Sequence, residues 1–230
     1  MLFDLRGRGR RRAVQGIYLS LAVLMGGGLV LFGIGGATNG GLLDAFKGQS
    51  GKTSANDIFQ KRVTAAEKQV RLRPSDANAW AQLTRVRFQQ ASVGEGFNQA
   101  QGAFTDKGKV QLRGAEQAWD RYLKLAKKPS DQVASLMVQA FSQTGLNEPD
   151  KAVAAQEIIL ANRQPTPQLY VQLAALAYQA GQTRKAELAS KKALELTPKD
   201  SQEQIKSLLQ EARLAASATL SKGSSATPSS

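Results

Sequence analysis

The sequence lacks the two side chains on which most enzyme sites depend, because its 230 residues include no His and no Cys. Their absence excludes Ser-His-Asp triads, Cys nucleophiles, imidazole or thiolate metal sites and disulfides. The carboxylates are scattered over predicted helix ends and polar faces, as in Asp120, Asp131, Glu148, Asp150 and Glu157. None of them forms a pair in an evident pocket. We therefore expect no enzyme activity, no cofactor, no metal site and no small-molecule substrate.

One short motif, Gly51-Lys52-Thr53, resembles the end of a phosphate-binding loop. A complete loop of that kind needs a preceding strand and a glycine at the position of Phe46. Neither is present. The motif instead lies in a segment rich in Gly, Ser and Thr, residues 38–55, whose composition is typical of a flexible linker. We predict that this segment tethers the domain that follows it.

The residues before this linker indicate a membrane anchor. Five arginines stand in residues 1–15 against the single acid Asp4, and residues 17–37 are uncharged and mostly apolar. A helix of that length crosses a hydrocarbon core of roughly 30 Å. The clustered arginines before the span, and the lack of basic residues after it until Lys47, favour a cytoplasmic N-terminus. We predict a basic tip (1–15) and a transmembrane helix (16–37) in a bacterial cytoplasmic membrane, with the following domain outside the cytoplasm.

Alternatives to this anchor stay open. A cleaved signal peptide also has a basic start, but its apolar core is usually about 7 to 15 residues long, and the best cleavage site here is the poor Gly35-Gly36-Ala37. A reversed topology would leave the domain in the cytoplasm. Small residues four apart in the span, such as Ala22 and Gly26, would let two such helices pack closely, which allows a homo-oligomer.

From Asp57 onward the apolar residues follow a helical period and the sequence repeats itself. Residues 166–198 read as two antiparallel helices, with small side chains where the helices would cross, a glycine after the first helix and a proline after the second. This stretch resembles a tetratricopeptide repeat (TPR). The residues that match the family's positions 4, 7, 8, 15, 20, 27 and 32 are Tyr170, Leu173, Ala174, Gly181, Ala186, Ala193 and Pro198.

Weaker copies precede this one. Ala152 stands 34 residues before Ala186, which is the period of the family, and Trp80 follows Pro74 at the spacing expected between a repeat and the next. In the first copy about 22 residues, around 92–109, are inserted between the two helices or lengthen them.

The resemblance implies an all-α fold, a solenoid of helical hairpins. About three helix pairs, with a leading and a capping helix, would occupy residues 56–216. The tail, residues 217–230, is rich in Ser, Ala and Thr and is predicted to be disordered.

In that family the first helix of each pair turns positions 2, 5, 9, 12 and 13 toward a bound polypeptide. Position 12 is aromatic in all three predicted pairs, and small apolar residues stand at position 5 in all three pairs and at position 9 in the second and third. The resemblance implies a protein-binding groove lined by Phe88, Phe141, Tyr178, Val138, Val171, Ala175 and Arg85. The Lys and Asn pattern with which family members hold a C-terminal carboxylate is missing, so we expect an apolar segment of another protein as the partner.

Two alternatives for the aromatic side chains stay open. Many repeats bury an aromatic residue at position 11, so a register error of one would make Phe88, Phe141 and Tyr178 core residues. Alternatively, the insertion, with Phe97 and Phe104, would fold back and fill the groove.

The chain carries a net charge of +13. Lysines after the predicted second helices, such as Lys127 and Lys128, suit helix C-termini, and attraction to an anionic membrane or envelope polymer stays open. The aromatic residues do not alternate with basic ones as nucleic-acid binding would need. We expect a membrane-anchored TPR adaptor that binds another protein outside the cytoplasm and assists secretion, folding or envelope assembly. The alternative is a structural envelope component held by oligomerisation and charge.

Overall fold

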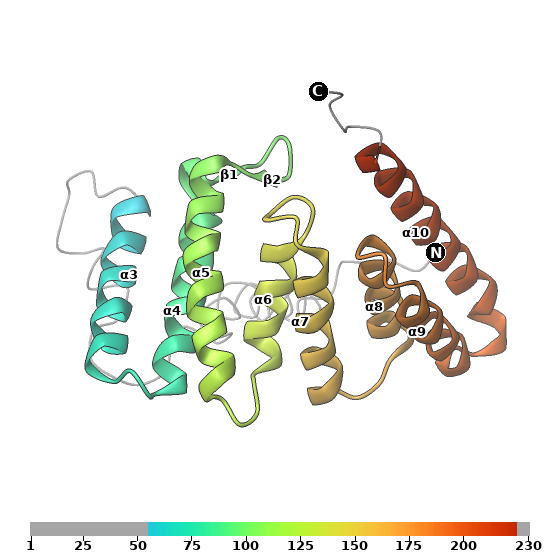
Figure 1. Cartoon of the computed structure of the whole chain (residues 1–230), viewed down its shortest axis with the longest axis horizontal. Helices are drawn as coiled ribbons and strands as arrows, with labels where there is room; N and C mark the ends of the chain where they lie inside the picture. Colours follow the sequence, from blue (N-terminus) through green and yellow to red (C-terminus); the bar gives the residue numbers. More distant parts are fainter. Residues whose placement is uncertain (1–54, 225–230) are drawn as a thin grey trace, which may run out of the picture. The chain divides into compact units, whose positions relative to one another are not determined.

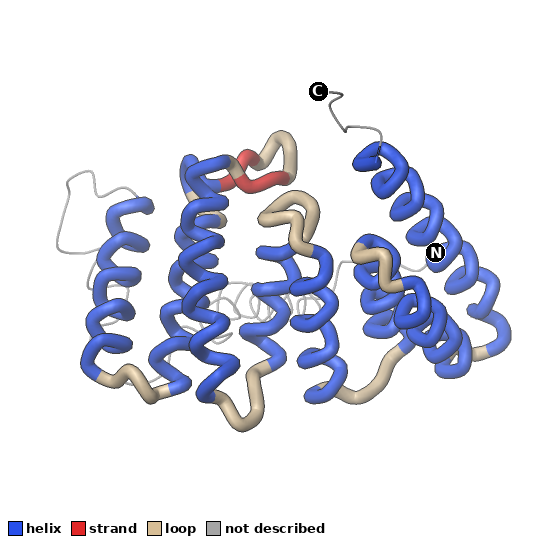
Figure 2. The backbone as a smooth tube through the Cα atoms, viewed as in Figure 1, coloured by secondary structure: helices blue, strands red, loops and turns tan. Residues whose placement is uncertain are grey.

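The computed structural model describes residues 55–224, and these belong to one compact unit. This part of the chain is all-α, apart from one two-stranded hairpin (Figures 1 and 2). The predicted tip (1–15), transmembrane helix (16–37) and nearly all of the linker (38–55) lie outside the described residues. Between residues 55 and 224, none of the helices combines the length and the apolar character that a membrane span requires.

The described helices form three pairs, with one helix before them and one after. The leading helix is α3 (Ala55–Leu72), and the closing helix α10 (Gln202–Ser224) packs on α8. The pairs are α4 (Ala77–Ala91) with α5 (Asp106–Leu125), α6 (Asp131–Phe141) with α7 (Pro149–Asn162), and α8 (Pro167–Gln179) with α9 (Thr183–Leu196). The two helices of each pair run antiparallel, as expected for residues 166–198 (Figure 1). Short loops join α6 to α7 and α8 to α9, whereas a longer segment joins α4 to α5.

The first helix of each pair starts at a polar side chain that caps it. Asp76, Ser130 and Thr166 precede α4, α6 and α8, and each accepts a hydrogen bond from a backbone N–H two or three residues later. Such caps satisfy amides that have no partner inside the helix. Pro149 and Pro167 occupy the first turns of α7 and α8, where a missing N–H costs nothing. Local sequence signals therefore set where these helices begin.

The turn between α8 and α9 depends on a glycine. Gly181 has a φ of +68°, a left-handed conformation that residues with a Cβ adopt only at a cost. Its N–H donates to the carbonyl oxygen of Tyr178 at 3.0 Å. Pro198 follows Thr197, the C-cap residue of the second helix. The predicted glycine between the helices and proline after them are both confirmed.

Alanines lie where the two helices of each pair approach. Ala118, Ala152 and Ala186 recur every 34 residues on α5, α7 and α9, and none is more than 1% exposed. Because a methyl group takes little room, paired helices approach closely at these points. The 34-residue period of the sequence is therefore also the interval at which buried alanines recur between packed helices.

Three clusters of buried side chains run through the domain. The N-terminal core joins α3 to α4, and includes Val63, Val70 and Leu83. The central core joins α4, α5, α6 and α7 to the hairpin, and the C-terminal core joins α8, α9 and α10 to Val153 of α7. The large buried residues of the central core include Leu112, Trp119, Met137 and Phe141, whereas the C-terminal core is mostly alanine, with Leu173, Ile205 and Leu209.

The predicted insertion is a β-hairpin between α4 and α5. Strands β1 (Phe97–Asn98) and β2 (Ala103–Phe104) pair with Phe97 opposite Phe104. The Asn98 side-chain oxygen accepts hydrogen bonds from the N–H groups of Ala100 and Gln101, and Gly102 turns with a φ of +61°. The turn of the hairpin is therefore stabilised by the Asn98 side chain and by the left-handed conformation of Gly102.

The chain departs from the sequence prediction at its C-terminal end. The tail was expected to be disordered from residue 217, but α10 continues to Ser224. This extension contains Ala, Leu and Lys and no proline, and its single glycine is next to the helix end, so nothing stops the helix earlier. Residues 225–230 lie outside the described range.

Candidate functional site

Two adjoining cavities run along the first helices α6 and α8 and together form a groove. Each has a volume of about 440 Å³, and Val138, Gln139 and Leu176 line both. We call the one beside the β-hairpin the hairpin cavity and the other the amide cavity. Volumes of this size lie in the range of small-ligand and peptide-side-chain pockets.

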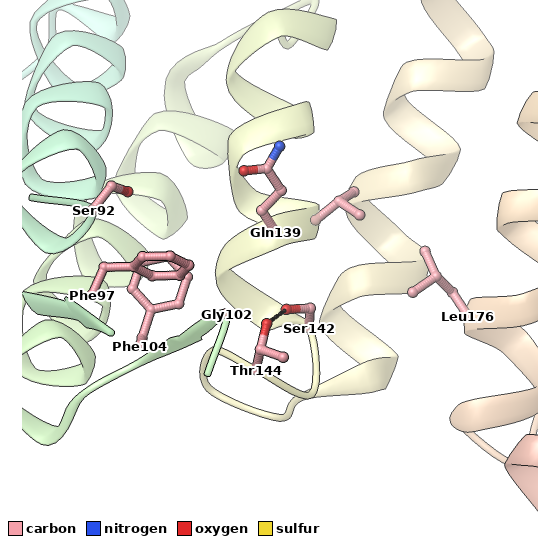
Figure 3. Close-up of a pocket in the computed structure, with 9 residues that line it drawn as sticks. Ser92, Phe97, Gly102, Phe104, Gln139, Ser142, Thr144 and Leu176 are labelled. Carbon is pink, nitrogen blue, oxygen red and sulfur yellow. Dashed lines mark hydrogen bonds between the residues drawn. The ribbon is translucent and has the colours of Figure 1, made fainter. Parts of the chain in front are cut away.

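The hairpin cavity has apolar walls on two sides. Phe97 and Phe104 come from the hairpin and Val138 from α6. Leu176 of α8 lies on the opposite side of the cavity from the two rings (Figure 3). Along its polar edge, the hydroxyl oxygens of Ser142 and Thr144 lie 3.1 Å apart. Of the described residues that line this cavity, none carries a charge.

The amide cavity is lined by glutamine side chains from three helices. Gln156 of α7 is 1% exposed, and its Nε2 donates to the Leu169 carbonyl oxygen at 3.2 Å and to Oε1 of Gln172 at 3.3 Å. Gln139 and Gln172 are exposed to solvent. Side-chain amides both donate and accept, so this wall matches the peptide group in polarity.

The one charged side chain on this wall is neutralised by a neighbour. Nε of Arg163 donates to Oδ2 of Asp131 at 2.7 Å. That hydrogen bond, together with the guanidinium charge, holds the pKa of the Asp131 carboxyl below its usual range. The groove as a whole is therefore close to neutral, in a chain of net charge +13.

The structure brings only part of the predicted site together. Val138 and Ala175 line the groove as expected. Tyr178 lines a different cavity, of about 570 Å³, formed by α8, α9 and α10. Val171 is half-buried against the C-terminal core, and Arg85 is half-buried on α4, away from both parts of the groove.

Two of the predicted aromatic residues are core residues and do not line the groove. Phe88 is 7% exposed and Phe141 is 1% exposed, both within the central core. The reason is helix geometry: residues four apart share a face, and Val133, Met137 and Phe141 form one such buried stripe on α6. The groove side of α6 carries the half-buried Ser135 and the exposed Gln139, which the sequence prediction missed, and the half-buried Ser142 follows the helix end.

The insertion does fold back, as the second alternative held, but it does not fill the groove. The ring of Phe104 packs edge-on against Phe88, with centroids 6.1 Å apart. Its N–H donates to the Thr144 carbonyl oxygen at 2.9 Å, which fixes the hairpin to the loop between α6 and α7. The hairpin is therefore a wall of the groove, and the cavity beside it stays open.

A cluster of four charges, which the sequence analysis missed, joins α5 to α7. Glu116, only 7% exposed, pairs with Arg113 and Lys151, and both of these bases also pair with Glu148. The signal was present in the sequence, because Arg113 to Glu148 and Glu116 to Lys151 are both separations of 35 residues, about one repeat. Opposite charges at that spacing meet on successive second helices.

The cluster shifts the titration of its members. Hydrogen bonds to Glu116 and then to Glu148 raise the pKa of Lys151 above its usual value. For Glu148, desolvation raises the pKa, but the hydrogen bonds from Lys151 and Arg113 outweigh it and the pKa is lowered overall. Two acids and two bases satisfy one another here, so the cluster stabilises the packing of α5 on α7 and offers no unpaired catalytic group.

Comparison with known proteins does not assign this chain to a family. The sequence matches no protein-family model, and it has no significant match among curated proteins. The groove, with its neutral amide wall and its aromatic hairpin wall, is therefore the feature from which a function can be argued.

Proposed function

We propose that this protein is a membrane-anchored adaptor of the tetratricopeptide-repeat type, which binds an extended segment of another protein in the groove. The observation that carries the proposal is the continuity of the two cavities through Val138, Gln139 and Leu176, across two successive helix pairs. An elongated surface that crosses stacked repeats suits a polypeptide lying along it.

The tetratricopeptide-repeat assignment is supported by the packing of the pairs. Buried alanines at a 34-residue period, Gly181 between two helices and Pro198 after the second are features that this repeat combines. Stacked pairs of this kind serve mainly as binding scaffolds, because each pair adds a first helix to one continuous surface.

The location of the adaptor is proposed from the sequence alone. An arginine-rich start before an uncharged apolar segment favours an anchor with its N-terminus in the cytoplasm and the helical domain outside it. A partner in secretion, folding or envelope assembly fits such a location. An alkaline phosphatase fused after Ser230 tests it: activity supports the proposed topology, and an inactive fusion of normal abundance overturns it.

Photocrosslinking in cells that make the full-length chain tests the binding function. A photoreactive residue would replace Gln139 or Gln172 in the groove, and Leu188 of α9, which is 63% exposed and does not line the groove, is the matched control. We expect the two groove positions to crosslink to the same protein and the control position not to do so. Equal crosslinking from all three positions, or none from the groove, would overturn the proposal.

A further inference from the structure

The hairpin is a fixed wall of the groove. Besides the Phe104 bond to Thr144, the Thr105 N–H donates to the Gly96 carbonyl oxygen at 3.0 Å, and the Thr105 hydroxyl donates to the Glu95 carbonyl oxygen at 2.6 Å. The rings of Phe97 and Phe104 pack edge-to-face, with centroids 5.1 Å apart. Hydrogen bonds at the base of the hairpin and ring packing between its strands hold the two phenylalanines beside the cavity.

The hairpin cavity is suited to a large apolar side chain. Its two hairpin phenylalanines lie across from Val138 and Leu176, as Figure 3 shows for the three of these four that it labels. A charged group placed between them would lose its hydration without gaining an ion pair from any described residue of this wall. The apolar walls therefore favour aromatic or branched aliphatic side chains and disfavour Asp, Glu, Lys and Arg.

The amide cavity, next to the hairpin cavity, limits which backbone groups a bound segment can present. Of its polar residues, Gln156 and Arg163 are already engaged, by Gln172 and Asp131. The Gln139 side chain makes no hydrogen bond to another described residue and is exposed on the wall that both cavities share. A free primary amide at that point can pair with the N–H and C=O of an extended chain, whatever its sequence.

We infer that the inserted hairpin gives the groove its specificity: the partner is an extended, uncharged polypeptide segment that places one aromatic or branched aliphatic side chain against Phe97 and Phe104. This inference rests on the proposed function and names the chemistry of the segment bound at the same groove. The segment's backbone runs past Gln139, from the hairpin cavity into the amide cavity.

A set of capped peptides that differ at one position tests the inference. The probes are acetyl-Ser-Val-Ser-X-Ser-Val-Ser-amide, where X is Phe, Leu, Asp or Lys. The purified full-length chain in detergent would carry a fluorophore on Gln143→Cys, at an exposed loop residue beside the groove. Because the chain has no natural cysteine, that label is single. We expect the Phe and Leu probes to bind at least about tenfold more tightly than the Asp and Lys probes.

Two variants connect this preference to the wall. Phe97→Ala should reduce the preference for Phe and Leu to less than about threefold, because it removes half of the aromatic wall. Gln139→Glu places a negative charge on an exposed residue and should leave the fold intact. It should make the Lys probe bind more tightly than the Asp probe, whereas Gln117→Glu, on an exposed part of α5 outside the groove, should leave the order unchanged.

The outcomes separate the inference from the proposed function. Affinity that does not depend on X, no binding of any probe, or a Gln139→Glu variant that behaves like Gln117→Glu would each overturn the inference. If crosslinks still form at Gln139 and Gln172 but not at Leu188, the proposed function stands without the hairpin's specificity. If those crosslinks are also absent, both fail.

Discussion

The repeat pattern in the sequence gives Phe141 of the central core and Tyr178 of the C-terminal core the same position in their first helices, and the two residues lie in different environments. Phe141 at the end of α6 is 1% exposed, whereas Tyr178 at the end of α8 is half-buried and lines an open cavity. The neighbours explain this difference. Within residues 55–224, the α6–α7 pair packs against α4, α5 and α8, while the α8–α9 pair has α7 on one side and the single closing helix α10 on the other.

Repeat position in the sequence alone therefore does not decide burial. A residue at a given repeat position is buried when another helix pair and the hairpin pack beside it. At the end of the stack of helix pairs, a residue at that position stays partly exposed. Three predictions test this contrast. Each compares a change in α6, in α7 or at the residue before α7 with a counterpart in the α8–α9 pair.

The largest expected effect is at the two aromatic residues. Phe141→Ala should lower the free energy of unfolding by about 3–5 kcal/mol, because it leaves a cavity in packed surroundings. Tyr178→Ala should cost no more than about 1 kcal/mol, because solvent already reaches that ring. Chemical denaturation followed by circular dichroism measures both. If the two substitutions lower the free energy of unfolding equally, Phe141 is not more tightly packed than Tyr178.

A smaller difference is expected where the helices of a pair cross. Ala152→Leu should destabilise the domain by about 1–3 kcal/mol, because four heavy atoms cannot fit where a methyl group is fully buried. Ala186→Leu should cost less, because α9 has fewer neighbours and can shift outward. The exposed Ala154 of α7 supplies the control, and Ala154→Leu should leave the unfolding midpoint nearly unchanged. A midpoint unaffected by Ala152→Leu would contradict close packing there.

The smallest effect concerns charge and depends on pH. Because the pKa of Glu148 is lowered on folding, its ion pairs stabilise the domain above the carboxyl's unfolded pKa, and that stability is lost as pH falls through the lower folded value. Glu148→Gln should lower the free energy of unfolding by about 1 kcal/mol at neutral pH. It should also make that free energy fall less steeply as the pH is lowered.

Glu195, paired with Lys192 on α9 and 47% exposed in its side chain, is the matched control for Glu148. Glu195→Gln should change stability by no more than about 0.5 kcal/mol at any pH, because surface pairs contribute little. If the free energy of unfolding falls with decreasing pH in the same way in the Glu148→Gln variant and in the unchanged protein, the charge cluster does not contribute to stability as described.

Much of the helical arrangement was predictable because local signals fix it. Caps such as Ser130 and Thr166, and the glycine and proline around α9, act within a few residues and can be read from sequence. The hairpin was not predictable in form, since two strands of two residues each carry too little pattern. Its position as an insertion was clear from the broken repeat period.

The candidate site was predicted only in part, because its lining depends on tertiary packing. Val138 and Ala175, which the repeat pattern assigned to the groove, line its cavities. Phe141 does not, because one stripe of a helix is buried or exposed according to the pair that packs beside it. Gln139 gave no signal, since a single exposed glutamine on a helix is ordinary until a hairpin stands opposite it.

The most direct test of the account is the affinity of the full-length chain for the partner that the groove crosslinks capture. Val138 is the residue to change, because it lines both cavities, and Leu188 of α9 is the control. Val138→Glu should weaken binding at least about tenfold and Leu188→Glu less than about twofold. Equal effects of the two substitutions, or unchanged binding by Val138→Glu, would contradict the claim that this groove binds a polypeptide.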